Sequence, residues 1–143
     1  MCGISGIFDW NSLKNAEHIA SVMKDAQNHR GPDFNSTYKD ENILISHNRL
    51  SIIDLDHHSN QPMHSNLGDV VISYNGELYN YLNLKSELEA TYSFKTQSDT
   101  EVIIASYLKW GIRMLDRFEG MFAFALWDKA KKQLFLARDR MGI

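Results

Sequence analysis

Cys2 is the residue whose type and position together predict chemistry. It is the only cysteine of the chain, and it directly follows Met1 in the segment MCGISG. Removal of Met1 would give Cys2 a free α-amine, which titrates near pH ~7.7 to 8.0 and can take the proton of a thiol that titrates near ~8.5. One residue then supplies nucleophile and base, because the amine replaces the histidine of a catalytic triad. The alternative is that a small side chain merely follows the start codon, and position alone does not separate the two.

Composition excludes several other kinds of function. The chain has 143 residues, which suits one domain, and a net charge of -3, which offers nothing to a nucleic acid or an anionic membrane. A single cysteine cannot form an internal disulfide, and no apolar run approaches the ~18 residues that span a bilayer. The amino terminus lacks the pattern of a secretion signal, so we expect a cytoplasmic protein. The histidines show no metal-ligand spacing, so we expect no metal site.

Short apolar runs predict the strands that must position Cys2. The first run places Cys2 at the end of a strand, and small residues within it would let another backbone approach closely. The Asn75-Gly76 pair after a β-branched run predicts a sharp turn. The expected strands are Gly3–Phe8, Ile43–Ile45, Leu50–Ile53, Val70–Tyr74, Met121–Trp127 and Gln133–Ala137.

Helix signals separate these strands. Ile19, Val22, Met23 and Ala26 recur at helical spacing and predict an amphipathic helix that buries them. A second helix is expected over Asn80–Glu89. A third begins at a Ser98–Glu101 capping box and ends at Gly111, with a short helical piece near 114–118. The polar segment 56–66 predicts a surface loop. Strands interleaved with helices indicate a layered α+β domain, and the pattern alone leaves one sheet or two open.

A set of motifs gives the chain a recognisable family. They are MCGISGIFD (1–9), HRGPD (29–33), RLSIID (49–54), QP (61–62), YNGELYN (74–80), SDTEVI (98–103), GMFAFALWD (120–128) and ARDRMGI (137–143). With them the whole chain resembles the glutaminase domain of asparagine synthetases, a class II glutamine amidotransferase of the N-terminal nucleophile hydrolase superfamily. The resemblance implies a four-layer αββα sandwich of two mostly antiparallel sheets.

The resemblance also assigns the catalytic roles. Cys2 attacks the side-chain amide of glutamine, releases ammonia and leaves a γ-glutamyl thioester, which water converts to glutamate. The oxyanion would be held by the Asn75 side chain and the Gly76 N–H, although the commoner meaning of that dipeptide is a plain turn. The loop 29–33 is expected to support the site without taking part in the chemistry.

Further residues would bind the ends of the amino acid. By resemblance, Arg49 holds the α-carboxylate, for which a guanidinium is well suited, and Asp99 with Glu77 holds the α-ammonium. Taken alone, Arg49 would more often be a surface charge, and Asp99 would be favoured at a helix start whatever the ligand. Backbone groups would line the same pocket at Leu50, Ser51, Ile52 and Ile53.

The same resemblance sets the expected partners. The chain ends at Ile143 inside a motif that normally continues, so we expect a C-terminally incomplete glutaminase domain over 1–143. No cofactor is expected here, because ATP and Mg²⁺ would belong to an absent C-terminal synthetase domain. The expected partners are L-glutamine and that domain, a homodimer is left open, and neither nucleic acid nor membrane is expected.

Three functions follow as hypotheses. The first is glutamine hydrolysis that supplies ammonia for ATP-dependent asparagine synthesis. The second keeps the glutaminase but delivers ammonia to another carboxylate or a sugar. The third is an inactive domain that binds glutamine or docks a partner. Retention of Cys2, Asn75 and Asp99 argues against the third.

Overall fold

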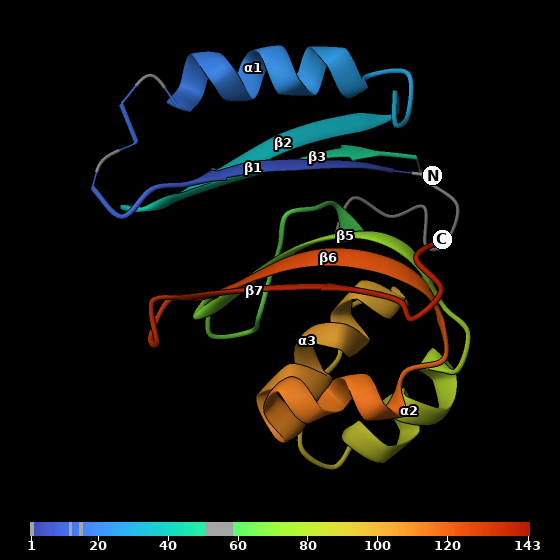
Figure 1. The fold of residues 1–143 in the computed structure, drawn as a ribbon. Coiled ribbons are helices and arrows are strands. Elements are labelled where there is room, and N and C mark those ends of the chain that lie inside the picture. The colour runs from blue at the N-terminus through green and yellow to red at the C-terminus, as the bar shows by residue number, and fades with distance from the viewer. Residues whose placement is uncertain (1, 12, 15, 51–58) are drawn as a thin grey trace.

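Four layers of secondary structure make up the protein, seen edge-on in Figure 1. The computed structural model describes residues 2–11, 13–14, 16–50 and 59–143. Sheet A has the order β1-β3-β2 and sheet B the order β4-β5-β6-β7, and every pairing is antiparallel. Helix α1 covers the outer face of sheet A, and the remaining helices cover the outer face of sheet B. The predicted αββα sandwich is therefore confirmed.

The elements follow the chain in this order: β1 (Gly3–Phe8), α1 (Ala16–Gln27), β2 (Phe34–Lys39), β3 (Ile43–Arg49), β4 (Met63–His64), β5 (Val70–Leu78), α2 (Tyr81–Leu88), α3 (Asp99–Trp110), the 3-10 helix η2 (Gly111–Arg117), β6 (Gly120–Asp128) and β7 (Gln133–Arg138).

The core divides along the layers. Val70, Ile72 and Tyr74 of β5 face α3 within the largest apolar cluster. The alternate residue Val71 packs between the sheets with Ile43, Ile45 and Trp127. Because side chains alternate along a strand, Asn75 lies on the same face of β5 as Val71, toward sheet A.

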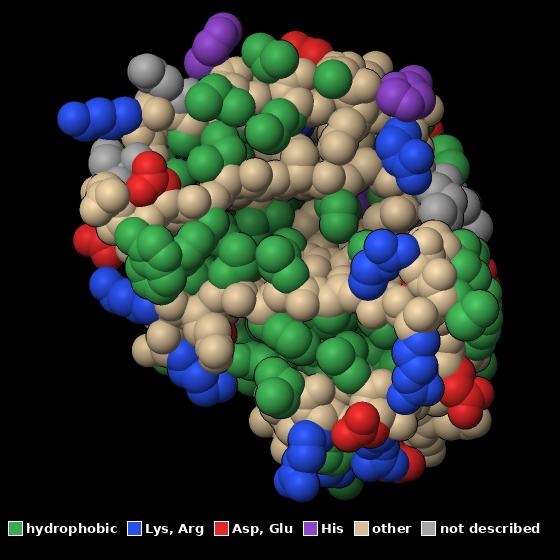
Figure 2. All heavy atoms as spheres, viewed as in Figure 1, with side chains coloured by type: hydrophobic (Ala, Val, Ile, Leu, Met, Phe, Trp, Pro, Cys, Tyr) green, Lys and Arg blue, Asp and Glu red, His purple; other side chains and the backbone are tan. Residues whose placement is uncertain are grey.

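An apolar groove runs between the open edges of the two sheets, β1 and β7. Its lining includes Ile4, Ile7, Phe8, Leu134 and Leu136. Figure 2 shows hydrophobic side chains gathered on this face of the molecule. The active-site candidates lie elsewhere, at the end of β1 that carries Cys2.

Helix α1 corrects one prediction from the sequence. Its buried residues are Ala16 and Ala20, which pack with Leu44, whereas Ile19 and Val22 are 42% and 55% exposed. Small side chains allow the helix to lie close to β1 and β3, where Gln27 and Asn48 add hydrogen bonds to backbone oxygens. The apolar spacing therefore predicted the helix correctly but predicted the wrong face of it to be buried.

Three local predictions were also wrong. Asn75-Gly76 is not a turn, because β5 continues through it and pairs with β6 as far as Leu78. The described part of the predicted surface loop contains β4 and the buried residues Ser59, Gln61 and Ser65. Strand β2 was missed, because its sequence FNSTYK is polar and lies at the edge of sheet A.

Candidate active site

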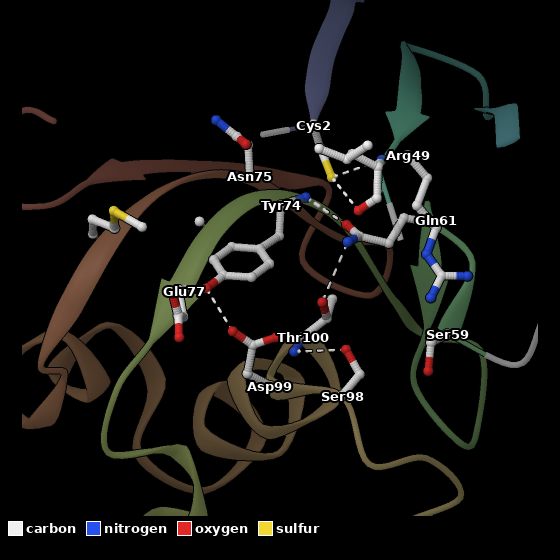
Figure 3. Close-up of a pocket in the computed structure, with 13 residues that line it drawn as sticks. Cys2, Arg49, Ser59, Gln61, Tyr74, Asn75, Glu77, Ser98, Asp99 and Thr100 are labelled. Carbon is white, nitrogen blue, oxygen red and sulfur yellow. Dashed lines mark hydrogen bonds between the residues drawn. The ribbon is translucent and has the colours of Figure 1, made fainter. Parts of the chain in front are cut away.

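The backbone of Leu50 holds the Cys2 thiol at the end of β1. Gly3 pairs with Asn48, so Cys2 lies beside the end of β3. The Leu50 N–H donates to Cys2 Sγ at 3.4 Å, and Sγ lies 3.7 Å from the Leu50 carbonyl oxygen (Figure 3). The sulfur therefore lies between a backbone donor and a backbone acceptor of the same residue, which fix its position at the strand end.

The HRGPD segment braces the same strand end. Arg30 Nε donates to the Cys2 carbonyl oxygen at 3.2 Å, and the Asp33 N–H donates to the Arg49 carbonyl oxygen at 3.1 Å. Gly31 between them is buried, and a Cβ there would overlap the Asn48 backbone oxygen. The segment therefore fixes the backbone around Cys2, as the sequence predicted.

Every described residue that the sequence analysis named for the site lines one open pocket. This pocket is partly open to solvent. The residues named beforehand are Cys2, Arg49, Leu50, Asn75, Gly76, Glu77 and Asp99. The predicted lining residues Ser51, Ile52 and Ile53 lie outside the described residues.

Strand β5 turns alternate peptide groups toward this pocket. The Tyr74 N–H donates to Gln61 Oε1 at 2.6 Å and the Tyr74 carbonyl oxygen lies 3.1 Å from His47 Nε2, so both groups point away from β6. Antiparallel pairing alternates along a strand, so the peptide groups of Gly76 and Leu78 face the same edge. The Leu78 N–H does so, because it donates to Asp99 Oδ2 at 3.0 Å. The Gly76 N–H therefore points to the pocket edge between them.

Steric contact explains the glycine at this position. A Cβ at Gly76 would overlap the Met121 backbone oxygen and approach Phe122 Cα to 2.7 Å. Asn75 beside it has an Oδ1 that is buried without a hydrogen-bond partner among the described residues. This atom is a hydrogen-bond acceptor and would meet a donor group of a ligand, whereas an oxyanion would need the Nδ2 of the same amide.

Asp99 is the buried carboxylate of the pocket. Its Oδ2 accepts from the Tyr74 hydroxyl at 2.8 Å and from the Leu78 N–H at 3.0 Å, and the residue lines the pocket. Burial raises the pKa of Asp99, while the Leu78 N–H and then the Tyr74 hydroxyl act to lower it. Burial, together with the neighbouring Asp99 charge, also raises the pKa of Tyr74. Tyr74 therefore stays protonated and remains a hydrogen-bond donor.

The start of α3 holds Asp99 in place. Ser98 is the N-cap, and its Oγ accepts from the Thr100 N–H at 3.2 Å. The predicted capping box is only half formed, because Glu101 accepts from the N–H groups of Lys95 and Thr96 instead of from Ser98. The Ser98 N–H is taken by Thr96 Oγ1 at 3.2 Å. Glu101 thus fixes the segment that leads into the helix.

Two further charged side chains complete the rim of the pocket. Arg49 is 5% exposed at the end of β3, and its Nη1 donates to Asn60 Oδ1 at 2.6 Å. In Figure 3 its guanidinium lies on the Ser59 side of the pocket. Glu77 lies across the pocket, close to Tyr74, and is exposed. A cation and two anions on opposite sides suit the two charged ends of an amino acid.

Other residues of the pocket received no role from the sequence. Gln61 and Tyr74 each stood inside a recognised motif, but the pattern did not indicate what they touch. Gln61 lay in a segment predicted as a surface loop, and Tyr74 was one apolar position of a strand. The remaining lining residues are Ser59, Ser98, Thr100 and Met121.

Two kinds of feature are absent from the described residues. They contain no group of three His, Cys, Asp or Glu side chains arranged to hold a metal ion. Among the same residues, none of the helices is long and apolar enough for a membrane span.

Comparison with known proteins gives this arrangement a family. The sequence matches the glutamine amidotransferase domain over residues 1–143. It is 42% identical to asparagine synthetase (glutamine-hydrolyzing) 2 of Bacillus subtilis and 39% identical to asparagine synthetase B (glutamine-hydrolyzing) of Escherichia coli. It is also 36% identical to amidase chry2 of Gibberella zeae.

Each alignment covers the whole chain but only a part of the relative. The chain spans 19%, 26% and 23% of the lengths of these three proteins. The similarity therefore concerns the part that contains Cys2 and its pocket. Since the family match runs through every described residue of that pocket, the chain belongs to the glutamine amidotransferase domain family and is related to asparagine synthetases.

Proposed function

We propose that this domain hydrolyses L-glutamine to glutamate and ammonia through a thioester on Cys2. The observation that carries the proposal is one pocket in which the Cys2 thiol, the Gly76 edge of β5 and the Asp99 carboxylate meet. These groups would serve as the nucleophile, the oxyanion site and the ammonium site that acyl transfer from an amino-acid amide needs.

The chemistry begins at sulfur. With Met1 removed, the α-amine of Cys2 takes the thiol proton, and the thiolate attacks the side-chain amide carbon of glutamine. The tetrahedral oxyanion accepts hydrogen bonds from the Gly76 N–H and the Asn75 amide. The α-ammonium of Cys2 gives its proton to the amide nitrogen, so that the C–N bond breaks and ammonia leaves. Water then attacks the thioester carbon, which releases glutamate and returns the proton to sulfur.

Recognition of the substrate uses the opposite side of the pocket. Arg49 would hold the α-carboxylate, while the carboxylates of Asp99 and Glu77 would hold the α-ammonium. The described edges of the pocket thereby distinguish a free amino acid from a peptide, in which both charged ends are lost. Glutamine reaches the thiol with its side-chain amide when these ends are fixed.

The destination of the ammonia is a second part of the proposal. Two of the relatives are named asparagine synthetases, so asparagine formation by a C-terminal synthetase domain is the favoured use. ATP and Mg²⁺ would act in that domain, and none of the steps above involves them. In the second candidate another carboxylate or a sugar receives the ammonia, and it stays open because one relative of similar identity is named an amidase and not an asparagine synthetase.

The proposed hydrolysis is tested by trapping the nucleophile. The purified protein is treated with the glutamine-like electrophile 6-diazo-5-oxo-L-norleucine, and intact mass and peptide mapping follow. We expect loss of Met1 and a single adduct on Cys2, prevented by excess glutamine. The Cys2→Ser variant should bind glutamine, carry no adduct and lose most hydrolysis. A folded, processed protein without an adduct would instead support an inactive binding domain.

A further inference from the structure

Gln61 is a buried amide that the proposed chemistry does not use. It belongs to the Gln61-Pro62 motif, lines the pocket and is 6% exposed. We propose that Gln61 is a positioning residue for oxyanion binding, because its side chain fixes the Tyr74 peptide and thereby aims Asn75 and Gly76 at the substrate carbonyl. The inference rests on the proposed glutaminase function.

The contacts of Gln61 join three parts of the fold. Its Oε1 accepts from the Tyr74 N–H at 2.6 Å, and its Nε2 donates to Thr100 Oγ1 at 3.3 Å. Its backbone oxygen accepts from Ser36 Oγ at 2.6 Å. The side chain therefore connects β5 to the start of α3, while the main chain is anchored on β2.

Strand β5 needs this support because its neighbour is short. β4 pairs only with Val71 and Ile72, so within the described residues strand pairing on this edge ends before Tyr74. A buried peptide N–H must still find an acceptor. Gln61 Oε1 accepts from the Tyr74 N–H, and His47 Nε2 donates to the Tyr74 carbonyl oxygen. The side chains of Gln61 and His47 thus make the two hydrogen bonds to Tyr74 that a longer neighbouring strand would otherwise make.

A shift of the Tyr74 peptide would move Gly76 along β5, and with it the N–H proposed to hold the oxyanion. Gly76 lies two residues beyond Tyr74, and its N–H faces the same edge. A misplacement of about 1 Å in a catalytic group can cost roughly a hundredfold in rate. Both ends of the Gln61 amide contact protein groups, so the arrangement indicates positioning and not substrate binding.

A split between turnover and binding tests the proposal, in the protein at its full natural length. Gln61→Met keeps the length of the side chain and removes the acceptor. We expect kcat and the rate of Cys2 labelling by 6-diazo-5-oxo-L-norleucine to fall about tenfold or more. The KM for glutamine should stay within about threefold, because the Tyr74 hydroxyl and the Leu78 N–H still hold Asp99 when the bond from Gln61 to Thr100 is lost.

Matched variants separate positioning from general stability. Ser36→Ala removes a hydrogen bond to the backbone of Gln61 but leaves the amide in place, so kcat should stay near that of the parent. Gln61→Glu retains an acceptor for the Tyr74 N–H and should recover part of the turnover lost in Gln61→Met. If Gln61→Met does not fold, Gln61→Asn withdraws the acceptor by one methylene and should show the same loss of kcat.

The outcomes separate the positioning role of Gln61 from the proposed glutaminase function. A folded Gln61→Met or Gln61→Asn protein with parental kcat and labelling rate overturns the positioning role while the glutaminase stands. A parent protein that does not react at Cys2 contradicts the proposed function, and the inference falls with it.

Discussion

At the scale of single residues, His47 is a buried histidine that the fold keeps neutral. It is 0% exposed, its Nε2 donates to the Tyr74 carbonyl oxygen, and Nδ1 has no partner among the described residues. Burial lowers its pKa to about 4, and the charge of Arg49 adds to this effect, whereas the hydrogen bond to Tyr74 opposes it. The imidazole therefore acts as a fixed donor to β5.

This histidine should make stability depend on pH. An unfolded histidine titrates near ~6.5, so between about pH 6.5 and 4 the unfolded chain binds a proton that the folded chain does not. The free energy of unfolding should thus fall as the pH falls through this window, by up to ~1.4 kcal/mol per pH unit from this residue. Urea unfolding of the parent and of His47→Gln measures the difference. Parallel stability curves for the two proteins would contradict the prediction.

Tyr74 offers a second test at this scale. Its hydroxyl donates to Asp99 and lowers the pKa of that carboxyl, against the effect of burial. In Tyr74→Phe the pKa of Asp99 should rise, and less of it is ionised to bind the ammonium group. We expect the KM for glutamine to increase about tenfold with kcat little changed, and the rise of KM in acid to begin at higher pH.

The control for Tyr74→Phe is built into the chain. The Tyr107 hydroxyl donates to Asp128 Oδ2 at 2.9 Å, a bond of the same kind outside the pocket. Tyr107→Phe should leave both KM and its pH profile unchanged. Equal KM profiles for Tyr74→Phe and the parent would show that the hydroxyl does not set the state of Asp99.

Motifs predicted the candidate site residues but not the residues that support them. Cys2, Asn75 and Asp99 stand in recognisable segments, and the structure brings them to one pocket. The roles of Gln61 and His47 depend on contacts with Tyr74 across 13 and 27 positions of the chain. A single sequence contains no signal for such contacts, because they exist only once the sheets are packed.

At the scale of elements, β5 shows tertiary pairing overriding a local preference. Asn-Gly favours a turn, yet Asn75 and Gly76 pair with Ala123 and Phe122 in the middle of sheet B. Pairing with a buried neighbour satisfies more backbone groups than a turn would. The polar edge strand β2 was missed for a related reason, since only its pairing with β3 defines it.

Gly76→Ala tests how closely β5 and β6 approach. The added Cβ would overlap the Met121 backbone oxygen, so the strands must separate. We expect a loss of about 2 kcal/mol or more in the free energy of unfolding, and loss of most hydrolysis in the folded fraction. Chemical denaturation and a glutaminase assay measure the two effects.

Gly68 is the matched control for this substitution. Its φ is 73°, and a Cβ there would touch nothing. Gly68→Ala should therefore lose only the conformational preference of glycine for positive φ, about 1–2 kcal/mol in the free energy of unfolding. Its glutamine turnover should equal that of the parent. Parental activity in Gly76→Ala as well would show that the β5 edge tolerates displacement.

At the scale of the whole molecule, the two sheets are joined at both ends by polar groups. At the site end, His47 of β3 bonds the Tyr74 carbonyl oxygen of β5, and Gln61 joins the Tyr74 N–H to Ser36 of β2. At the other end, Trp127 Nε1 of β6 donates to Asp40 Oδ2, between β2 and β3, at 3.0 Å. This bond is the largest contribution that lowers the pKa of Asp40. Apolar contacts of Ile43, Ile45 and Val71 lie beside it.

Trp127→Phe should separate stability from activity. The variant keeps an aromatic ring in the core but loses the hydrogen bond to Asp40, and we expect the free energy of unfolding to fall by about 1–3 kcal/mol. Trp127 pairs with Val71, four residues before Asn75 on β5, so kcat/KM for glutamine should stay at the parental value. Urea unfolding and steady-state kinetics on the same preparation test both statements. Trp10→Phe, at a side chain that is 74% exposed, should change neither quantity. If Trp127→Phe instead lowered kcat/KM, the packing between the two sheets would help to set the geometry at Cys2. The pocket would then depend on distant packing and not only on the local contacts around it.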